Sequence, residues 1–168
     1  MITQEYIKSV LHYDQDTGIF TWKVNKSNMK IGSVAGNKHN SGYTYIKLDK
    51  KLYAAHRLAW IYIYGKSPVH YIDHINGNKM DNRLFNLREA TNFQNQCNRK
   101  LNKNNTSGVK GISWDKQYNK WKVRLSVNSK KIILGRFYDF FEACCIVYSA
   151  RNKLHGEFAN HGSRTSMG

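Results

Sequence analysis

The chain has 168 residues, with 27 Lys and Arg against 11 Asp and Glu, a formal net charge of +16 and a pI near 9.8. Its content of 40% hydrophobic and 13% aromatic residues is enough to build cores, which excludes a disordered chain. No apolar run approaches the roughly 18 residues that a membrane span needs. The N-terminal residues lack the pattern of a secretory signal, and the three cysteines form neither a CxxC motif nor a disulfide framework. We therefore expect a reducing, cytoplasmic setting and no membrane contact.

The positive charge is the first indication of function. Residues 1–68 carry a net charge of +6, residues 69–103 carry +3 and residues 104–168 carry +7. A surplus of this size attracts polyanions, and nucleic acid is the commonest of these. A merely solubilising surface is the alternative, but the even spread favours a contact surface distributed along the chain over a single basic arm.

The first 68 residues predict short helices and strands. Apolar residues at helical spacing predict an opening helix, aromatic and β-branched residues predict a strand, and a Gly/Asn-rich stretch predicts a loop. Next come a hairpin, whose turn is Asp49-Lys50-Lys51, and a buried helix that ends before Gly65. In chain order, these segments are the helix 2–11, the strand 18–24, the loop 32–42, the hairpin strands 43–48 and 52–55, and the helix 57–64.

Residues 98–107 form the one clear break in composition. They are polar, Asn-rich and nearly free of apolar side chains. This composition predicts a linker between two domains, and a long surface loop inside one domain is the alternative.

The densest polar chemistry lies in residues 71–95. A strand is expected to end in Asp73-His74, and residues 86–90 can return as a second short strand after a loop. Thr91 and Gln94 make a Thr-x-x-Gln capping box, which predicts that a helix starts at Thr91 and places Asn95 in its first turn. A hairpin followed by this helix would bring Asp73, His74 and Asn95 together.

These three residue types suit phosphodiester hydrolysis. The carboxylate of Asp73 and the amide oxygen of Asn95 are hard ligands for Mg²⁺ or Mn²⁺. A neutral His74 imidazole could take a proton from water, while one metal ion stabilises the charge on the phosphate. The alternative is structural, with Asp73 and Asn86 holding a turn and His74 buried and hydrogen-bonded.

The segment His56-Arg-Leu-Ala-Trp … Ile-Asp-His-Ile-Asn-Gly-Asn … Asp-Asn … Asn-Leu-Arg … Thr … Gln-Asn95 resembles HNH endonucleases of phage homing-type genes. The resemblance covers roughly residues 50–100 and implies a ββα-metal core that cleaves DNA with one divalent cation, Mg²⁺ or Mn²⁺. It implies His74 as general base, Asp73 and Asn95 as metal ligands, and Asn86 as the residue that ties the loop and helps to orient His74. His56 is expected to be a buried structural histidine, and His70 is given no role.

Residues after 108 predict three strands and a helix. Period-two alternation places Trp121, Val123, Leu125 and Val127 on one strand face and Lys120, Lys122, Arg124 and Ser126 on the other. The cationic face suits DNA phosphates and base edges, with an ordinary solvated face as the alternative. Asn128-Ser129 turns the chain into the strand 130–137. Asp139 and Glu142 then form a capping box for a helix that Gly156 ends. This helix has an apolar face of Ala143, Val147, Ala150 and Leu154, with Cys144 and Cys145 as small packing residues.

The pattern Gly108-Val-Lys-Gly-Ile-Ser-Trp … Trp121-Lys-Val-Arg … Leu134-Gly-Arg-Phe … Leu-His-Gly156 resembles the plant Apetala-type (ethylene-response-factor) DNA-binding domain over residues 105–160. The resemblance implies a three-stranded antiparallel sheet in the major groove, backed by one helix. Ile112 and Ile133 stand where plant members carry Arg and Trp, so the plant recognition sequence is not expected. The residues expected to face DNA are Lys110, Ile112, Trp114, Lys122, Arg124, Lys131 and Ile133.

The sequence therefore predicts an α+β protein in which an HNH nuclease core precedes a three-stranded antiparallel sheet packed on one helix. The expected parts are a catalytic domain at 1–97 with its core at 50–97, a linker at 98–107, a DNA-binding domain at 108–160 and a tail at 161–168. We expect a site-preferring DNA endonuclease that acts on double-stranded DNA as a monomer, or alternatively as a dimer, in the bacterial host cell if it is phage-encoded. A non-catalytic DNA-binding regulator that retains the HNH scaffold is the main alternative, and an RNA-binding protein is the third.

Overall fold

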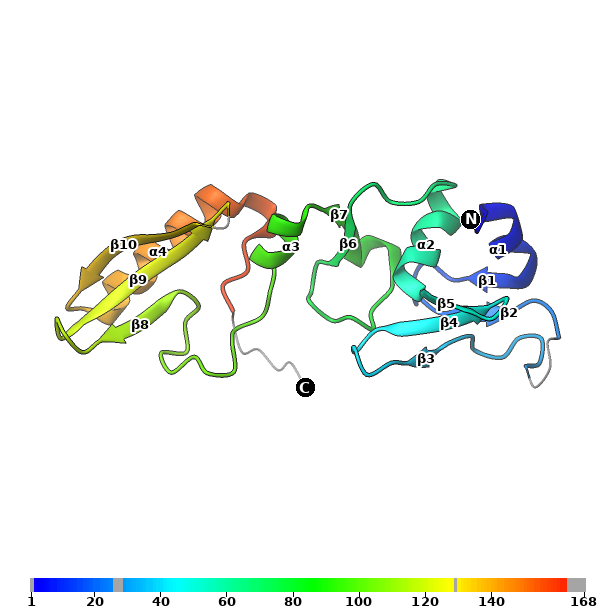
Figure 1. The fold of residues 1–168 in the computed structure, drawn as a ribbon, viewed down its shortest axis with the longest axis horizontal. Helices are drawn as coiled ribbons and strands as arrows, with labels where there is room; N and C mark the ends of the chain where they lie inside the picture. The colour runs from blue at the N-terminus through cyan, green and yellow to red at the C-terminus, as the bar shows by residue number, and fades with distance from the viewer. Residues whose placement is uncertain (1, 26–28, 129, 163–168) are drawn as a thin grey trace. The chain divides into compact units, whose positions relative to one another are not determined.

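The computed structural model describes residues 2–25, 29–128 and 130–162, and the chain divides into two compact units, Met1–Thr91 and Asn92–Gly168. Each unit combines helices with short antiparallel strands, so the fold is of the mixed α+β class (Figure 1). No helix among the described residues is long and apolar enough to cross a membrane.

One hydrophobic core holds the first unit together. It includes Ile7, Phe20, Ile46, Leu58 and Ile72, which come from both helices and three separate sheets. The elements, in chain order, are α1 (Gln4–Val10), β1 (Leu11–Tyr13), β2 (Phe20–Trp22), β3 (Asn37–Lys38), β4 (Thr44–Leu48), β5 (Lys51–Ala54), α2 (Ala55–Tyr64), β6 (Tyr71–His74), the 3₁₀ turn η1 (Leu84–Asn86) and β7 (Leu87–Ala90).

The predicted elements of this unit are present with adjusted ends. The opening helix is capped by the Thr3 side chain, which accepts a hydrogen bond from the Tyr6 N–H. The β4–β5 hairpin turns on two residues, Asp49 and Lys50, which both have positive φ, so Lys51 belongs to the strand. Helix α2 ends at Gly65, whose φ of 70° is the left-handed conformation that glycine adopts without strain.

The hairpin β6–β7 carries the predicted catalytic residues. Its register pairs Tyr71 with Ala90, Asp73 with Arg88 and His74 with Leu87. The strand β6 therefore ends at His74, as the sequence predicts, and the loop that follows returns through η1.

Gly18 allows the turn between β1 and β2 to lie directly against this loop. Its φ is 72°, and a Cβ atom at this position would collide with the backbone of Asn82 and Arg83. The Leu84 N–H also donates to the carbonyl of Gln15 at 3.1 Å. The loop is therefore supported by a segment that lies far from it in the sequence.

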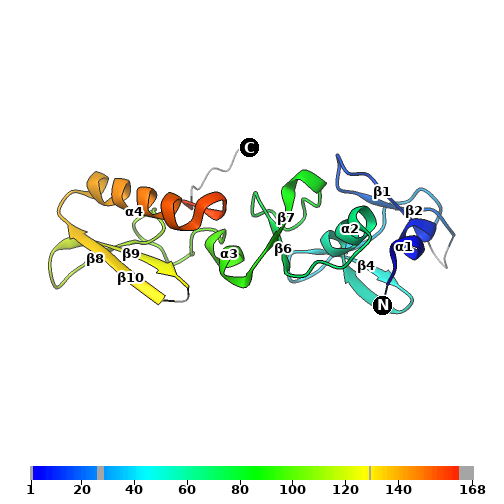
Figure 2. The ribbon, with the colours of Figure 1, turned by 90° about the horizontal axis from the view of Figure 1, so that it is seen from above.

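The second unit is a three-stranded sheet with a helix against one face. The sheet has the order β10-β9-β8, and α4 covers one side of it in both ribbon views (Figures 1 and 2). The small core between them is built from Ile112, Val123, Ala143 and Val147. The elements are α3 (Asn92–Cys97), β8 (Ile112–Asp115), β9 (Lys120–Val127), β10 (Lys130–Phe137), α4 (Phe140–His155) and the 3₁₀ turn η2 (Gly156–Phe158).

Helix α4 follows the sequence prediction at its ends but not along its whole buried face. Asp139 caps it by accepting a hydrogen bond from the Glu142 N–H at 2.7 Å, and Gly156 follows its last residue. Ala143 and Val147 are buried, but Leu154 is 44% exposed and Arg151, at 1% exposure, takes the place of a third apolar residue. The prediction for Leu154 is therefore wrong, because the buried row of the helix runs through Ala143, Val147 and Arg151 and leaves Leu154 beside it. Of the predicted turn and tail, Ser129 and residues 163–168 lie outside the described residues.

The stretch 98–107 lies inside the second unit, whose boundary falls between Thr91 and Asn92. The carbonyl of Asn98 accepts a hydrogen bond from the Asn160 side chain at 2.9 Å, and that of Arg99 accepts one from the Lys110 ammonium at 2.6 Å. The boundary between the units therefore lies before this stretch, whose backbone carbonyls are bound within the second unit, and its role as a linker stays a prediction.

Candidate active site

Asp73 and His74 lie side by side at the end of β6, and each is only 4% exposed. The Arg88 guanidinium, on the neighbouring strand, contacts Oδ2 of Asp73 through Nε at 3.1 Å and through Nη2 at 3.0 Å. Because successive residues of a strand point to opposite faces, the carboxylate and the imidazole project to different sides of the hairpin.

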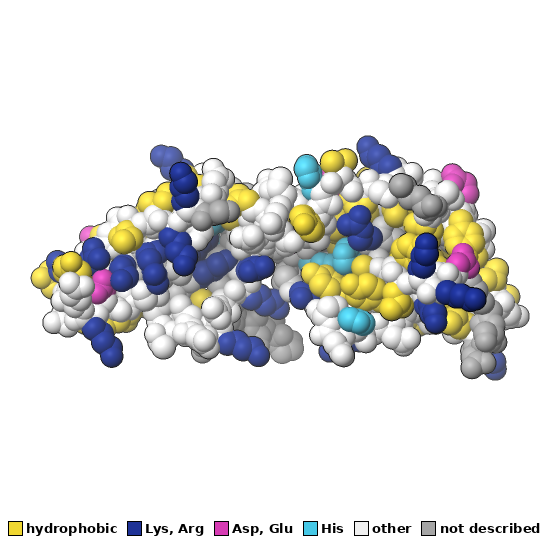
Figure 3. Space-filling model, in the orientation of Figure 1, with side chains coloured by type: hydrophobic (Ala, Val, Ile, Leu, Met, Phe, Trp, Pro, Cys, Tyr) yellow, Lys and Arg dark blue, Asp and Glu magenta, His cyan; other side chains and the backbone are white. Residues whose placement is uncertain are grey.

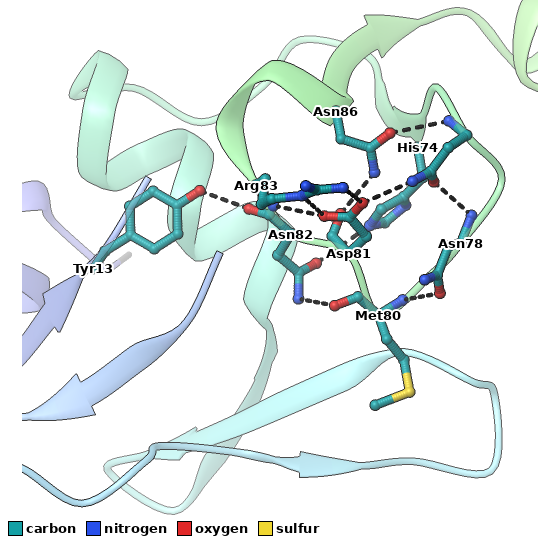
Figure 4. A network of polar contacts seen from close by, with 9 residues as sticks. Tyr13, His74, Asn78, Met80, Asp81, Asn82, Arg83 and Asn86 are labelled. Carbon is teal, nitrogen blue, oxygen red and sulfur yellow. Dashed lines mark hydrogen bonds and ion pairs between the residues drawn. The ribbon is translucent and has the colours of Figure 1, made fainter. Parts of the chain in front are cut away.

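The His74 ring is held by the side chain of Asn82. Its Nε2 lies 3.2 Å from Asn82 Oδ1, and Asn82 Nδ2 donates to the carbonyl of Met80 at 3.3 Å (Figure 4). The amide nitrogen of Asn82 thus acts as donor, which leaves Oδ1 as the acceptor and places the imidazole proton on Nε2. In this tautomer, the basic lone pair of His74 is on Nδ1.

Asn82 is fixed in turn by a residue from the start of the chain. The hydroxyl of Tyr13 donates to the carbonyl of Asn82 at 2.6 Å (Figure 4). Tyr13 is buried, and its ring stacks on Phe20 with centroids 4.7 Å apart. Burial raises the pKa of Tyr13 above its usual value of 10, so the hydroxyl stays a donor across the physiological range.

Asn86 closes the loop that carries Asn82. Its Oδ1 accepts from the Asn76 N–H at 3.0 Å and its Nδ2 donates to the carbonyl of Asp81 at 2.8 Å. Asp81 also forms an ion pair with Arg83 and accepts from the Asn76 side chain at 2.7 Å. The hydrogen bond from Arg83 is the largest cause that lowers the pKa of Asp81 below its usual value, so this carboxylate stays ionised and the loop stays braced.

A second histidine packs against the first. The rings of His56 and His74 meet edge to face with centroids 5.1 Å apart, and Tyr43 lies 5.0 Å from His56. Burial lowers the pKa of His56 to about 3, and the charges of His74 and Arg57 act in the same direction. Burial is also the largest cause that lowers the pKa of His74, so both rings are neutral at pH 7 and His74 can accept a proton.

The predicted residues are thus distributed over both units. Asp73, His74 and Asn86 are gathered on the β6–β7 hairpin, and His56 is buried, as expected. Asn95 lies on α3, in the second unit, and its role as a metal ligand stays a prediction. The sequence reasoning missed Asn82 as the partner of His74, because Asp81-Asn82 has ordinary turn composition. It also missed Tyr13, which is 69 residues away from Asn82.

The side chains of this site suit a cation that takes most of its ligands from water and substrate phosphates. Within the described parts of the chain, no group of three or more His, Cys, Asp or Glu side chains could hold a metal ion. Mg²⁺ commonly binds through one or two carboxylates while water and substrate phosphates complete its coordination. The single buried carboxylate of Asp73 fits that mode, although Arg88 offsets part of its charge.

The exposed face of the β8–β10 sheet is rich in cations. Figure 3 shows Lys and Arg side chains running across this unit over β9 and β10. Asp115 neutralises part of the charge through Lys122 and Arg136, each with a nitrogen 3.0 Å from its Oδ2. Arg124 and Lys131 are exposed and lie opposite Ile133 and Ser126 in the sheet register.

Of the residues expected to face DNA, Ile112 lies in the core, and the roles of Trp114 and Lys110 stay predictions. Ile112 is 2% exposed in the core beneath α4, so its prediction is wrong: it pairs with Val123 on the helix side. Trp114 pairs with Trp121 on that same side, although it is 45% exposed at the sheet edge. The Lys110 ammonium donates to the carbonyls of Cys97 at 2.8 Å and Arg99 at 2.6 Å.

Comparison with known proteins identifies the family. The family model described as HNH endonuclease matches residues 53–97, which include His56, His74 and Asn86. Protein 3.8 of Escherichia phage T7 is 39% identical over 117 residues, a match that spans 67% of this chain and 96% of the relative. The chain belongs to the same family as this phage protein and carries an HNH endonuclease domain at residues 53–97. No solved structure matches it.

For this HNH protein, the buried histidines predict a loss of stability in acid. The folded-state pKa of His56, about 3, lies below its usual value of 6.5, so the unfolded chain binds one more proton between these pH values. The contribution of His56 to the free energy of unfolding is therefore greatest above pH 6.5. It falls by about 1.4 kcal/mol for each pH unit below that value. The measurement is urea unfolding of the wild type and His56→Gln at pH 7, 6 and 5.

The substitution is expected to flatten the pH dependence by about one proton. His70→Gln is the matched control, because His70 is exposed and lies just outside β6. An unchanged slope in His56→Gln would show that His56 does not enter the folded state as the neutral ring described above.

Proposed function

We propose that this protein is a DNA endonuclease that hydrolyses phosphodiester bonds, with His74 as the general base. The observation that carries the proposal is the contact between His74 and Asn82, inside the region that matches the HNH endonuclease model. This contact fixes the tautomer of a neutral His74, so that its basic nitrogen is Nδ1, and the neighbouring residue in the chain is the buried carboxylate Asp73. Structural support for a histidine does not require the adjacent carboxylate, whereas metal-assisted hydrolysis uses both.

The chemistry follows from the tautomer. Nδ1 of His74 takes a proton from a water molecule, whose oxygen forms a bond to phosphorus while the bond from phosphorus to the 3′ oxygen breaks. The 3′ oxygen leaves and is protonated by solvent, which gives a 3′ hydroxyl and a 5′ phosphate. A divalent cation, Mg²⁺ or Mn²⁺, held by Asp73 and Asn95, would neutralise the charge on the phosphate and on the leaving oxygen. Asn86 and Asn82 orient the base through the loop.

The second unit is proposed to bind double-stranded DNA through the exposed face of its sheet, in the manner that the Apetala-type resemblance implies. The support comes from Arg124 and Lys131, which are exposed and face the same way, with Lys122 beside them. Arg side chains on such a face can contact phosphates or guanine edges, which are the two kinds of contact that position and select DNA.

A non-catalytic DNA-binding regulator is the second candidate. Two observations favour it: His74 is 4% exposed, and Arg88 already compensates the charge of Asp73. Incubation of the wild type with supercoiled plasmid in Mg²⁺ or Mn²⁺ decides between the two, because a nuclease yields nicked or linear DNA and a regulator leaves the plasmid intact.

His74→Ala is expected to abolish most of the cleavage. Loss of a general base typically costs about 10² to 10⁴ in rate, whereas the basic surfaces are untouched and DNA affinity should stay within a few-fold. Plasmid nicking and gel-shift titration of the same preparation measure the two quantities. Cleavage at the wild-type rate would show that His74 is not the base.

Substitutions of Asn82 should move the pH profile of cleavage in opposite directions. The hydrogen bond that His74 Nε2 donates to Asn82 raises the pKa of His74 against the effect of burial. Asn82→Leu removes this hydrogen bond. The cleavage rate should fall by about 10- to 100-fold, and the acidic limb of the pH profile should move to lower pH. Asn82→Asp keeps an acceptor and adds a negative charge, which raises the pKa of His74, so the acidic limb should move to higher pH.

The measurement is the rate of plasmid nicking at saturating cation between pH 5 and 8. Asn40→Ala, an exposed Asn in the same unit, is the control and should keep the wild-type profile. Identical profiles in both Asn82 variants would contradict the assignment of Asn82 as a positioning residue for a titrating base.

The cation is tested by its concentration dependence. Asp73→Asn and Asn95→Ala each weaken a proposed oxygen ligand, so half-maximal cleavage should need more Mg²⁺ or Mn²⁺, or cleavage should disappear. Asp16→Asn and Asn102→Ala change exposed residues of the same types and should leave the curve in place. Undiminished cleavage by the wild type in excess EDTA would rule out the cation.

A further inference from the structure

The second unit contains a cavity of about 500 Å³ whose charged lining residues are all basic. It is lined by residues of α3, the stretch that follows it, β9, β10 and the C-terminal half of α4. Five of the lining residues are Lys or Arg, one is His and none is acidic. The cations are Arg99, Lys110, Arg124, Lys131 and Arg151, and the histidine is His155.

Arg151 carries a buried charge without a counter-charge. It is 1% exposed, and its Nη2 donates to the carbonyl of Lys110 at 2.6 Å while Nη1 lies 3.4 Å from His161 Nδ1. Its Nε has no hydrogen-bond partner, and no carboxylate of the described residues forms an ion pair with it. Buried charges in proteins are normally paired, because removal of an ion from water is costly.

The neighbours of Arg151 do not supply the missing negative charge. His155 uses Nε2 to contact the carbonyl of Ser126 at 3.0 Å, and its buried Nδ1 has no partner. Lys110 is held by two backbone carbonyls, and burial, followed by the charge of Arg151, lowers the pKa of its ammonium to about 8. The charge of Arg151 lowers the pKa of Lys110, and the buried Nε of Arg151 lacks an acceptor, so an anion would complete this cluster.

We propose that this cavity binds a phosphate group, and that the phosphate belongs to the backbone of DNA lying on the exposed sheet face. A guanidinium offers several donors in a fixed plane and matches a phosphate with two parallel hydrogen bonds. Arg124 and Lys131 line the cavity and also belong to the exposed face of the sheet, so they connect the two. The assignment to DNA rests on the proposed function, whereas phosphate binding itself does not.

Binding of phosphate is tested by thermal unfolding of the full chain in inorganic phosphate and in chloride at equal ionic strength. A ligand that binds only the folded state raises its unfolding temperature. The wild type should show a rise in phosphate that Arg124→Gln/Lys131→Gln and Arg151→Met lose. Lys153→Gln removes an exposed cation of α4 outside the cavity and should keep the rise. The double variant changes only exposed side chains, so it keeps the test valid if Arg151→Met does not fold.

The source of the phosphate is tested by the salt dependence of duplex DNA binding, measured without divalent cation. Each lost phosphate contact should reduce the log–log slope by about 0.9, so Lys131→Gln should show a shallower slope than Lys153→Gln.

An equal rise in unfolding temperature in all variants, or no rise in any, overturns the phosphate site. A specific rise with unchanged DNA salt slopes overturns the DNA assignment and leaves free phosphate or a nucleotide as the ligand. None of these outcomes depends on cleavage, so the proposed nuclease activity stands or falls separately.

Discussion

The hydrogen bond between His74 and Asn82 is the contact on which the candidate active site depends. It sets the tautomer of the imidazole and thereby decides which nitrogen can take a proton. The bond exists only because the loop after β6 is held in place. Tyr13 fixes the backbone of Asn82, and Gly18 lets the β1–β2 turn approach the same backbone closely. The first strands of the chain, which carry no proposed chemistry, therefore position His74.

The two units treat charge in different ways. In the first unit, the site has two neutral histidines, and both acidic groups near them are compensated, Asp73 by Arg88 and Asp81 by Arg83. In the second unit, cations outnumber carboxylates, and the cavity around Arg151 lacks an acidic residue altogether. A surplus that the protein does not neutralise internally is available to a polyanion, which is consistent with DNA as the proposed substrate.

Particular residues show how far the sequence could be interpreted. Period-two alternation correctly assigned the two faces of β9, because Val123 and Leu125 are buried while Arg124 and Ser126 are exposed. The prediction for Ile112 failed because it rested on the resemblance and not on the register of its own strand, which pairs it with the buried Val123. Leu154 continued an apolar helical pattern, but the buried position in this part of the helix is taken by Arg151. Local patterns predict which residues share a face, but not where the opposing surface ends.

The sequence by itself determined the class of chemistry and the elements that carry it. Asp73-His74 at a strand end, Asn86 before the return strand and the excess of Lys and Arg are local or compositional features, and they are sufficient to indicate an HNH endonuclease. The tertiary structure alone decided that Asn82 is the partner of His74, that Tyr13 holds Asn82, and that Arg151 is buried among cations. The contacts of Tyr13 and Arg151 join segments far apart in the chain, and the contact between His74 and Asn82 depends on a loop that Tyr13 holds in place. No periodicity or spacing encodes contacts of that kind.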